Sequence, residues 1–148
     1  MKGRLSKNFR HALAEAHQVD EVKTIRNKAV ALAADARQAQ DREMVYWANE
    51  IKLRAERRSG QLLNDLAKTH QRQRRGRPKK NSVGDEILLS KQINEFGITH
   101  NQSADWQQLA AMPDDDFEQR LVRGKRDLSM MTTKRMRRPV PRPSAFAL

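Results

Sequence analysis

Apolar residues recur three or four positions apart through the first half of the chain, which is the spacing of one face of an α-helix. The pattern predicts a short amphipathic helix over residues 4–17 and a longer helix that begins near residue 20. After Glu43 the apolar positions fall one residue out of phase, and Asp41 is a suitable N-terminal cap for a further helix. We therefore expect either two helices that fold back on each other near residue 40 or one long helix with a register shift.

The longer helical segment has an alternating 3-4-3-4 spacing that is typical of a coiled-coil seam. Several seam positions are alanine, which lets helix axes approach closely but supplies little apolar area for each contact. Such a segment is expected to dimerise or to dock on another protein. The predicted oligomerisation residues are Val22, Ile25, Ala29, Leu32, Ala36, Ala39, Trp47 and Ile51.

Basic side chains occupy the helix faces opposite this seam. Their spacing favours a solvated surface with ion pairs between neighbouring turns over contact with nucleic acid. These residues are Lys23, Arg26, Lys28, Arg37, Lys52, Arg54, Arg57 and Arg58.

Composition points to the kind of partner. The 148 residues include 30 Lys and Arg against 18 Asp and Glu, and the resulting net charge of +12 favours a polyanion. Aromatic residues make up 5% of the sequence, so a large single core is not expected. The N-terminus lacks the apolar core of a signal peptide, and no apolar run approaches the ~20 residues that span a bilayer. We expect a cytoplasmic protein that does not contact a membrane.

The residue types do not favour catalysis or metal binding. The chain has no cysteine, which excludes disulfides and thiolate ligands, and its four histidines are too scattered to share a metal. No phosphate-binding loop or convincing acid–base pair is present. We expect no enzyme activity, no catalytic residue, no metal and no cofactor.

Half of the net charge lies in residues 71–80, which include six basic residues and no acidic one. At their centre is an Arg-Gly-Arg-Pro strip. Gly76 lets the backbone approach a groove floor, and Pro78 holds Arg77 extended. The strip resembles the AT-hook, and the resemblance implies contact with the minor groove of A·T-rich duplex DNA. The predicted hook residues are Arg74, Arg75, Gly76, Arg77, Pro78, Lys79 and Lys80.

A second helical unit is predicted over residues 85–126. A helix from residue 85 leads to a turn at Gly97, and Thr99 with Gln102 three positions later fits a capping box for the next helix. Pro113 ends that helix before another one that carries Phe117 inward. This order is typical of a helix-turn-helix, and Trp106 is expected in its core.

Residues 96–113, together with Phe117, Leu121 and the pair Gly124-Lys125 that follow them, resemble the helix-turn-helix region of ParB-type partition proteins. The nucleotide-binding motifs of that family are not part of the resemblance. The resemblance implies that the helix after Gly97 reads the major groove. Amide and hydroxyl side chains at its start could contact base edges. The predicted DNA-binding residues are Thr99, His100, Asn101, Gln102, Ser103 and Gln107.

The predicted organisation has four parts. Residues 1–68 form the helical association segment, 69–84 a flexible basic linker with the hook, 85–126 the helix-turn-helix domain, and 127–148 an extended basic tail with prolines. Segments 22–29 and 51–58 also resemble small proteins from phages and other bacterial mobile elements. We therefore expect a DNA-binding regulator or nucleoid-associated protein in a bacterial host. A small-terminase-like packaging factor and a helical adaptor or inhibitor are the alternatives.

Overall fold

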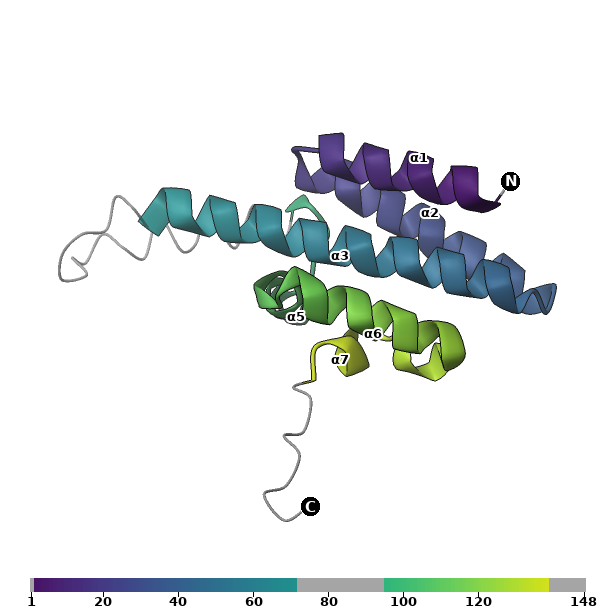
Figure 1. Ribbon diagram of the computed structural model, residues 1–148. Helices are drawn as coiled ribbons and strands as arrows, with labels where there is room; N and C mark the ends of the chain where they lie inside the picture. The colour runs from purple at the N-terminus through teal and green to yellow at the C-terminus, as the bar shows by residue number, and fades with distance from the viewer. Residues whose placement is uncertain (1, 72–94, 139–148) are drawn as a thin grey trace, which may run out of the picture.

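The computed structural model describes residues 2–71 and 95–138 (Figure 1). These residues form helices and contain no strand, which confirms the predicted all-α fold. The helices are α1 (Lys2–Glu15), α2 (Val19–Gln38), α3 (Arg42–Gln71), α5 (His100–Ala111), α6 (Asp114–Arg126) and α7 (Thr133–Met136), with the 3-10 turn η1 (Leu128–Met130) before α7.

The chain reverses direction between α2 and α3. Gln40 has a φ of 55°, and the backbone N–H of Asp41 donates to the carbonyl of Ala36 at 3.0 Å. This Schellman turn satisfies a carbonyl at the end of α2 that would otherwise lack a partner. The Asp41 carboxylate then accepts a hydrogen bond from the backbone N–H of Met44 at 3.1 Å. Asp41 therefore caps the start of α3, as its place in the sequence predicts.

The 30-residue α3 is the central helix of the fold and is about 45 Å long. Helices α1 and α2 lie along one side of it, and α5, α6 and α7 lie on the other side (Figure 1). A buried cluster of Leu13, Ala16, Val22 and Ala55 joins α1, α2 and α3. The apolar face of α2 is thus covered by helices of the same chain.

The structure corrects the expected use of the alanine-rich seam. Val22, Ala29, Ala36 and Ile51 are buried inside the single chain, with at most 4% of each residue exposed. Ile25, Leu32 and Trp47 are half-buried, and Ala39 is exposed. Small side chains on α2 let it lie close against α3, so the four buried seam residues pack within one molecule. Association with a second copy stays a prediction.

The C-terminal helices share their core with α3. One buried cluster joins α3 to α5, α6 and α7, and consists of Leu53, Leu109, Phe117, Leu121, Met131 and Met136. A second cluster joins α2, α3 and α5, and consists of Val19, Leu63, Ile98 and Trp106. The parts expected at 1–68 and 85–126 therefore contribute to common cores across the described residues.

Helix α5 lies close against α3 at Gly60. A Cβ atom on Gly60 would lie 1.9 Å from the backbone oxygen of Trp106, so a larger residue would push the helices apart. Trp106 is only 2% exposed, and the Arg26 guanidinium lies 5.2 Å from its ring centroid. The prediction that Trp106 belongs to the core is confirmed.

The turn that leads into α5 follows the predicted chemistry. Gly97 has a φ of 68°, in the left-handed region that favours glycine. The Thr99 side chain accepts from the backbone N–H of Gln102, and the Gln102 side chain accepts from the backbone N–H of Thr99, each at 3.1 Å. The Lys23 ammonium on α2 donates to the carbonyls of Phe96 and Gly97, which fixes this turn against α2.

The structure also corrects the extent of the predicted tail. Residues 127–138 continue the fold through η1 and α7, and Met131 and Met136 are each 2% exposed. The Thr133 hydroxyl donates to the buried carboxylate of Glu56 on α3 at 2.6 Å. Buried methionines thus anchor the first part of a segment that was expected to be extended. The proline-containing residues 139–148 lie outside the described part of the chain.

Candidate nucleic-acid interface

The predicted hook lies outside the described residues. Arg74, Arg75, Gly76, Arg77, Pro78, Lys79 and Lys80 all fall between the end of α3 and residue 95. The same holds for residues 85–94, which include most of the first helix expected for the helix-turn-helix. The hook and the complete helix-turn-helix stay predictions from the sequence.

The six predicted DNA-binding residues of α5 differ in accessibility. His100 and Asn101 are exposed in the first turn. Thr99 and Gln102 are engaged in the capping box. Ser103 is 4% exposed, and its hydroxyl accepts a hydrogen bond from the half-buried Gln107 amide at 2.9 Å. In this fold Ser103 lies too deep to reach a base edge, so it is a structural residue.

The C-terminal half of α5 is engaged by α7 and the residue that follows it. Arg137 lies 3.2 Å from the Asp105 carboxylate and donates to the Gln108 side chain at 2.8 Å. Gln108 is exposed, whereas the predicted Gln107 is turned toward Ser103. The polar face that α5 presents to solvent therefore runs through His100, Asn101 and Gln108.

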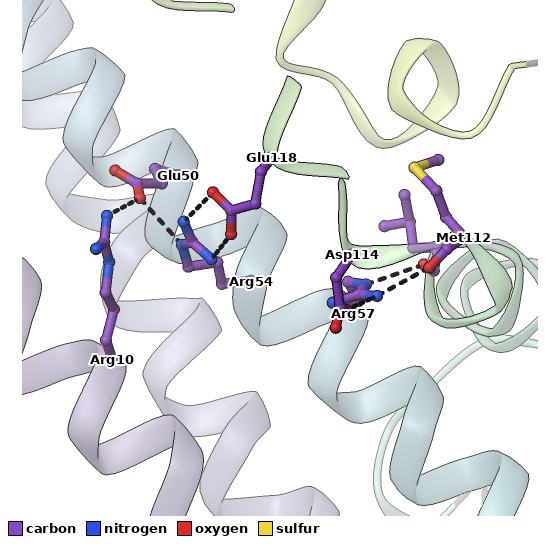
Figure 2. A network of polar contacts seen from close by, with 8 residues as sticks. Arg10, Glu50, Arg54, Arg57, Met112, Asp114 and Glu118 are labelled. Carbon is purple, nitrogen blue, oxygen red and sulfur yellow. Dashed lines mark hydrogen bonds and ion pairs between the residues drawn. The ribbon is translucent and has the colours of Figure 1, made fainter. Parts of the chain in front are cut away.

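An arginine-lined groove of about 460 Å³ lies between α1, α3 and α6. Its lining consists of Arg10, Leu13, Ala14, Arg54, Arg57, Arg58, Gln61 and Phe117. Arg54, Arg57 and Arg58 are three and four positions apart on α3, so a single face of that helix carries them. Figure 2 shows the polar contacts of Arg10, Arg54 and Arg57.

Arg54 connects two carboxylates from different elements. Its Nε donates to Glu50 at 3.0 Å, and its two terminal nitrogens donate to Glu118 on α6 at 2.7 and 3.0 Å (Figure 2). The hydrogen bonds from Arg54 lower the pKa of Glu118, with smaller contributions from the charges of Arg54, Arg10 and Arg57. Arg10 of α1 also contacts Glu50, which is only 2% exposed. Glu50 and Arg54 of α3 therefore hold α1 and α6, respectively, against α3.

Arg57 holds the junction between α5 and α6. Its guanidinium donates to the carbonyl of Leu109 at 3.3 Å and to the carbonyl of Met112 at 2.8 Å, and it contacts the Asp114 carboxylate (Figure 2). It also lies 4.9 Å from the ring centroid of Phe117. One planar side chain thus satisfies carbonyls at the end of α5 and an acid in the first turn of α6.

The groove therefore works mainly as an inter-helix clamp. Its four guanidiniums face three carboxylates, from Glu50, Asp114 and Glu118, so little net charge is left for an external anion. Arg58 donates to the carbonyl of Ala16 and to Gln61. Arg54, Arg57 and Arg58 are half-buried and contact other helices, which corrects the interpretation made from their spacing.

Charge is strongly segregated in the C-terminal part of the chain. Residues 95–118 include six acidic residues and no Lys or Arg, whereas residues 119–138 include eight basic residues and one acidic residue. The basic half comprises the end of α6, η1 and α7. Summed over the whole region after the hook, the two halves nearly cancel. The near-neutral sum concealed this segment in the sequence, and a charge count over twenty-residue windows would have found it.

The basic half meets the start of α3 at one end of the molecule. The Arg42 guanidinium of α3 donates to the carbonyl of Arg126 at 2.8 Å, and Arg42 and Lys125 line a common hollow. Arg123 is one turn before Arg126 on α6, and the charges of Arg135 and Arg42 both act on Asp127. We call the five exposed side chains of Arg42, Arg123, Lys125, Arg126 and Arg135 the basic corner.

Asp127 organises the turn inside the basic corner. Hydrogen bonds from the Ser129 hydroxyl and backbone N–H hold the pKa of the Asp127 carboxyl below its ordinary value, and the charges of Arg135 and Arg42 act in the same direction. The side chain caps η1 through the Ser129 N–H at 3.0 Å. The basic corner is therefore built on a capped turn with buried methionines beneath it.

No protein-family model, curated protein or solved structure matches this chain. None of the helices in residues 2–71 and 95–138 is long and apolar enough to cross a membrane. Within the same ranges, no group of three or more histidine and carboxylate side chains is arranged to hold a metal ion.

Proposed function

We propose that this protein binds DNA and acts as a regulator or nucleoid-associated protein of a phage or bacterial mobile element. The observation that carries the proposal is the folded basic segment 119–138, in which eight basic residues accompany one acid. Arg123, Lys125 and Arg126 project from the last turn of α6 as exposed side chains.

Electrostatics explains why such a corner suits a polyanion. Cations gathered on one surface repel one another, and a nearby chain of phosphates relieves that repulsion. Each phosphate that a lysine or arginine neutralises also releases condensed counterions, which favours binding at low salt. In the arginine-lined groove, by contrast, carboxylates of the protein already neutralise the arginines.

The hook supports the same proposal from the sequence. Its five basic residues lie between α3 and the C-terminal helices in the sequence, and its Arg-Gly-Arg-Pro core resembles a minor-groove element. In this proposal the hook supplies A·T preference and the basic corner adds phosphate contacts made by a rigid surface. The exposed His100 and Asn101 of α5 are the remaining candidates for base contacts.

A salt-controlled titration on duplex DNA tests the proposal. Fluorescence anisotropy would follow binding of A·T-rich and G·C-rich duplexes to the wild type, to a hook variant (Arg75→Ala with Arg77→Ala) and to a corner variant (Arg123→Ala, Lys125→Ala and Arg126→Ala). A matched control removes three exposed basic side chains of α1 and α2, through Lys7→Ala, Lys28→Ala and Arg37→Ala.

The corner variant should lower the slope of log affinity against log salt by about 2.7, at ~0.9 for each lost phosphate contact, and the control should leave it nearly unchanged. The hook variant should reduce the preference for the A·T-rich duplex. An equal loss in the control and corner variants would contradict the assignment to the basic corner. Absence of binding by the wild type to either duplex would contradict DNA binding itself.

A further inference from the structure

A hollow of about 310 Å³ opens at the basic corner, between the first turns of α3, the end of α6 and η1. Its lining consists of Arg42, Glu43, Tyr46, Trp47, Lys125 and Leu128. Two cations, two aromatic rings and an aliphatic side chain therefore meet in one place. This volume is at the lower end of the range in which small ligands bind.

The rings of Tyr46 and Trp47 form an aromatic wall of the hollow. Tyr46 and Trp47 are half-buried, and their ring centroids lie 5.5 Å apart with the planes at 66°. The indole Nε1 of Trp47 is enclosed and has no hydrogen-bond partner among the described residues.

The cations lie at the rim of the hollow. Lys125 is exposed, and Arg42 is held beside it by its hydrogen bond to the carbonyl of Arg126. The Glu43 carboxylate belongs to the same lining, so the hollow itself is less positive than the surface around it. Phosphates are thus favoured on the rim, and a planar group with donor and acceptor edges is favoured inside.

An unpaired nucleotide has both of these parts. Its base can stack on an aromatic side chain, and its flanking phosphates can contact Lys and Arg. A base inside a duplex is stacked between its neighbours and does not reach a side pocket without being extruded. The hollow is therefore suited to an unpaired base and not to a base that is stacked in a duplex.

We propose that this hollow binds one unpaired base of single-stranded DNA against Tyr46 and Trp47, while Arg42, Lys125 and Arg126 hold the adjoining phosphates. The inference rests on the proposed DNA binding and specifies the form of DNA that the folded body prefers. The protein would then bind a single-stranded stretch or an open end of a duplex more tightly than continuous duplex at the same salt.

The test compares three DNA probes of equal length on the full chain. These are a twelve-nucleotide oligothymidylate, an abasic strand with the same phosphates and a twelve-base-pair duplex, each followed by fluorescence anisotropy at 0.15 M salt. The oligothymidylate should bind about 5- to 100-fold more tightly than the abasic strand, which is the range for stacking of one base. A base stacked on Trp47 should also quench its fluorescence. The other tryptophan, Trp106, is only 2% exposed and should not contribute to this change.

A variant that fills the hollow isolates the role of the base. Leu128→Trp enlarges a half-buried lining residue and removes no charge, so oligothymidylate affinity should fall to that of the abasic strand. The matched control is Leu66→Trp, which fills a second hollow of about 310 Å³ beside α2 and α3 that has no Lys or Arg in its lining. Thermal unfolding followed by circular dichroism shows whether each variant is folded.

Equal affinity of the wild type for oligothymidylate and the abasic strand would overturn the inference. If the corner variant still weakened duplex binding in that case, the proposed function would stand without the hollow. Unchanged oligothymidylate binding in a folded Leu128→Trp variant would likewise overturn it, and tighter binding of oligouridylate than of oligothymidylate would overturn the assignment to DNA.

Discussion

The arginine-lined groove and the basic corner are both rich in arginine, yet they differ in what those arginines contact. In the groove, Arg54 and Arg57 bind carboxylates and backbone carbonyls of neighbouring helices. In the basic corner, Arg123 and Arg126 extend from the last turn of α6 into solvent. The first set closes contacts inside the protein, and the second adds charge to its surface.

This difference shows that the number of basic residues does not by itself locate a polyanion site. What decides is whether the protein supplies its own anions. The groove has four guanidiniums and three nearby carboxylates, whereas residues 119–138 have eight basic residues and one acid.

The largest effect is expected when the clamp loses its central cation. Arg54→Leu leaves Glu50, which is 2% exposed, with Arg10 as its remaining partner from another helix, and breaks both bonds to Glu118. The free energy of unfolding should fall by about 3 kcal/mol, because an uncompensated buried carboxylate is costly. Urea denaturation would measure the loss. The control Arg37→Leu, on the exposed side of α2, should change it by less than about 0.5 kcal/mol.

Removal of three charges from the basic corner should change the stability little and the affinity for DNA strongly. The variant Arg123→Ala, Lys125→Ala and Arg126→Ala should keep its free energy of unfolding within about 1 kcal/mol, since these side chains pack against little and assist only the end of α6. Its affinity for duplex DNA should fall by up to about 10²-fold at 0.1 M salt. A large loss of stability together with unchanged DNA affinity would show that the basic corner holds the fold together and does not bind DNA.

Exchange of arginine for lysine tests geometry against charge. Arg57→Lys keeps the charge but cannot bind two carbonyls and a carboxylate with one planar group, so stability should fall by about 1 kcal/mol. Arg126→Lys should leave both stability and DNA affinity nearly unchanged, because a phosphate contact needs mainly the charge. Paired unfolding and binding measurements on the two variants would reveal any departure from this pattern.

The smallest effect is expected from the titration of Glu118. Its pKa is lowered in the folded protein by hydrogen bonds from Arg54, so its contribution to stability is present above the ordinary pKa of a glutamate and is lost as the pH falls through the lowered value. The side chain is 55% exposed, and solvent screening limits the contribution to less than about 1 kcal/mol. The stability difference between wild type and Glu118→Gln should therefore shrink from pH 6 toward pH 3; a constant difference would contradict this origin.

Local sequence patterns predicted several features of the fold that the structure confirms. Asp41 caps α3, Gly97 adopts a left-handed turn, and Thr99 with Gln102 closes a capping box. Each feature depends on residues within four positions of one another, so the chemistry that produces it is readable along the chain. The burial of Trp106 followed from its size and its place on an apolar face.

The accessibility of the predicted site residues could not be read in the same way. Ser103 and Gln107 have the right chemistry for base contacts, but the fold turns them toward each other beneath the surface of α5. The seam of α2 had the spacing of an association surface, and α3 of the same chain covers it. In both cases the packing of distant helices decided whether a suitable side chain reaches solvent.

The amino-acid sequence by itself determined the helices, their caps, the excess of positive charge and the basic run at residues 71–80, because all of these depend on neighbouring residues or on composition. Only the tertiary structure decided which basic side chains are neutralised. Arg54 meets Glu118 and Arg57 meets Asp114 because α6 returns to α3, whereas Arg123 and Arg126 are exposed at the end of α6. Charge pairing acts over a few ångströms in space, and separation along the chain does not reveal it.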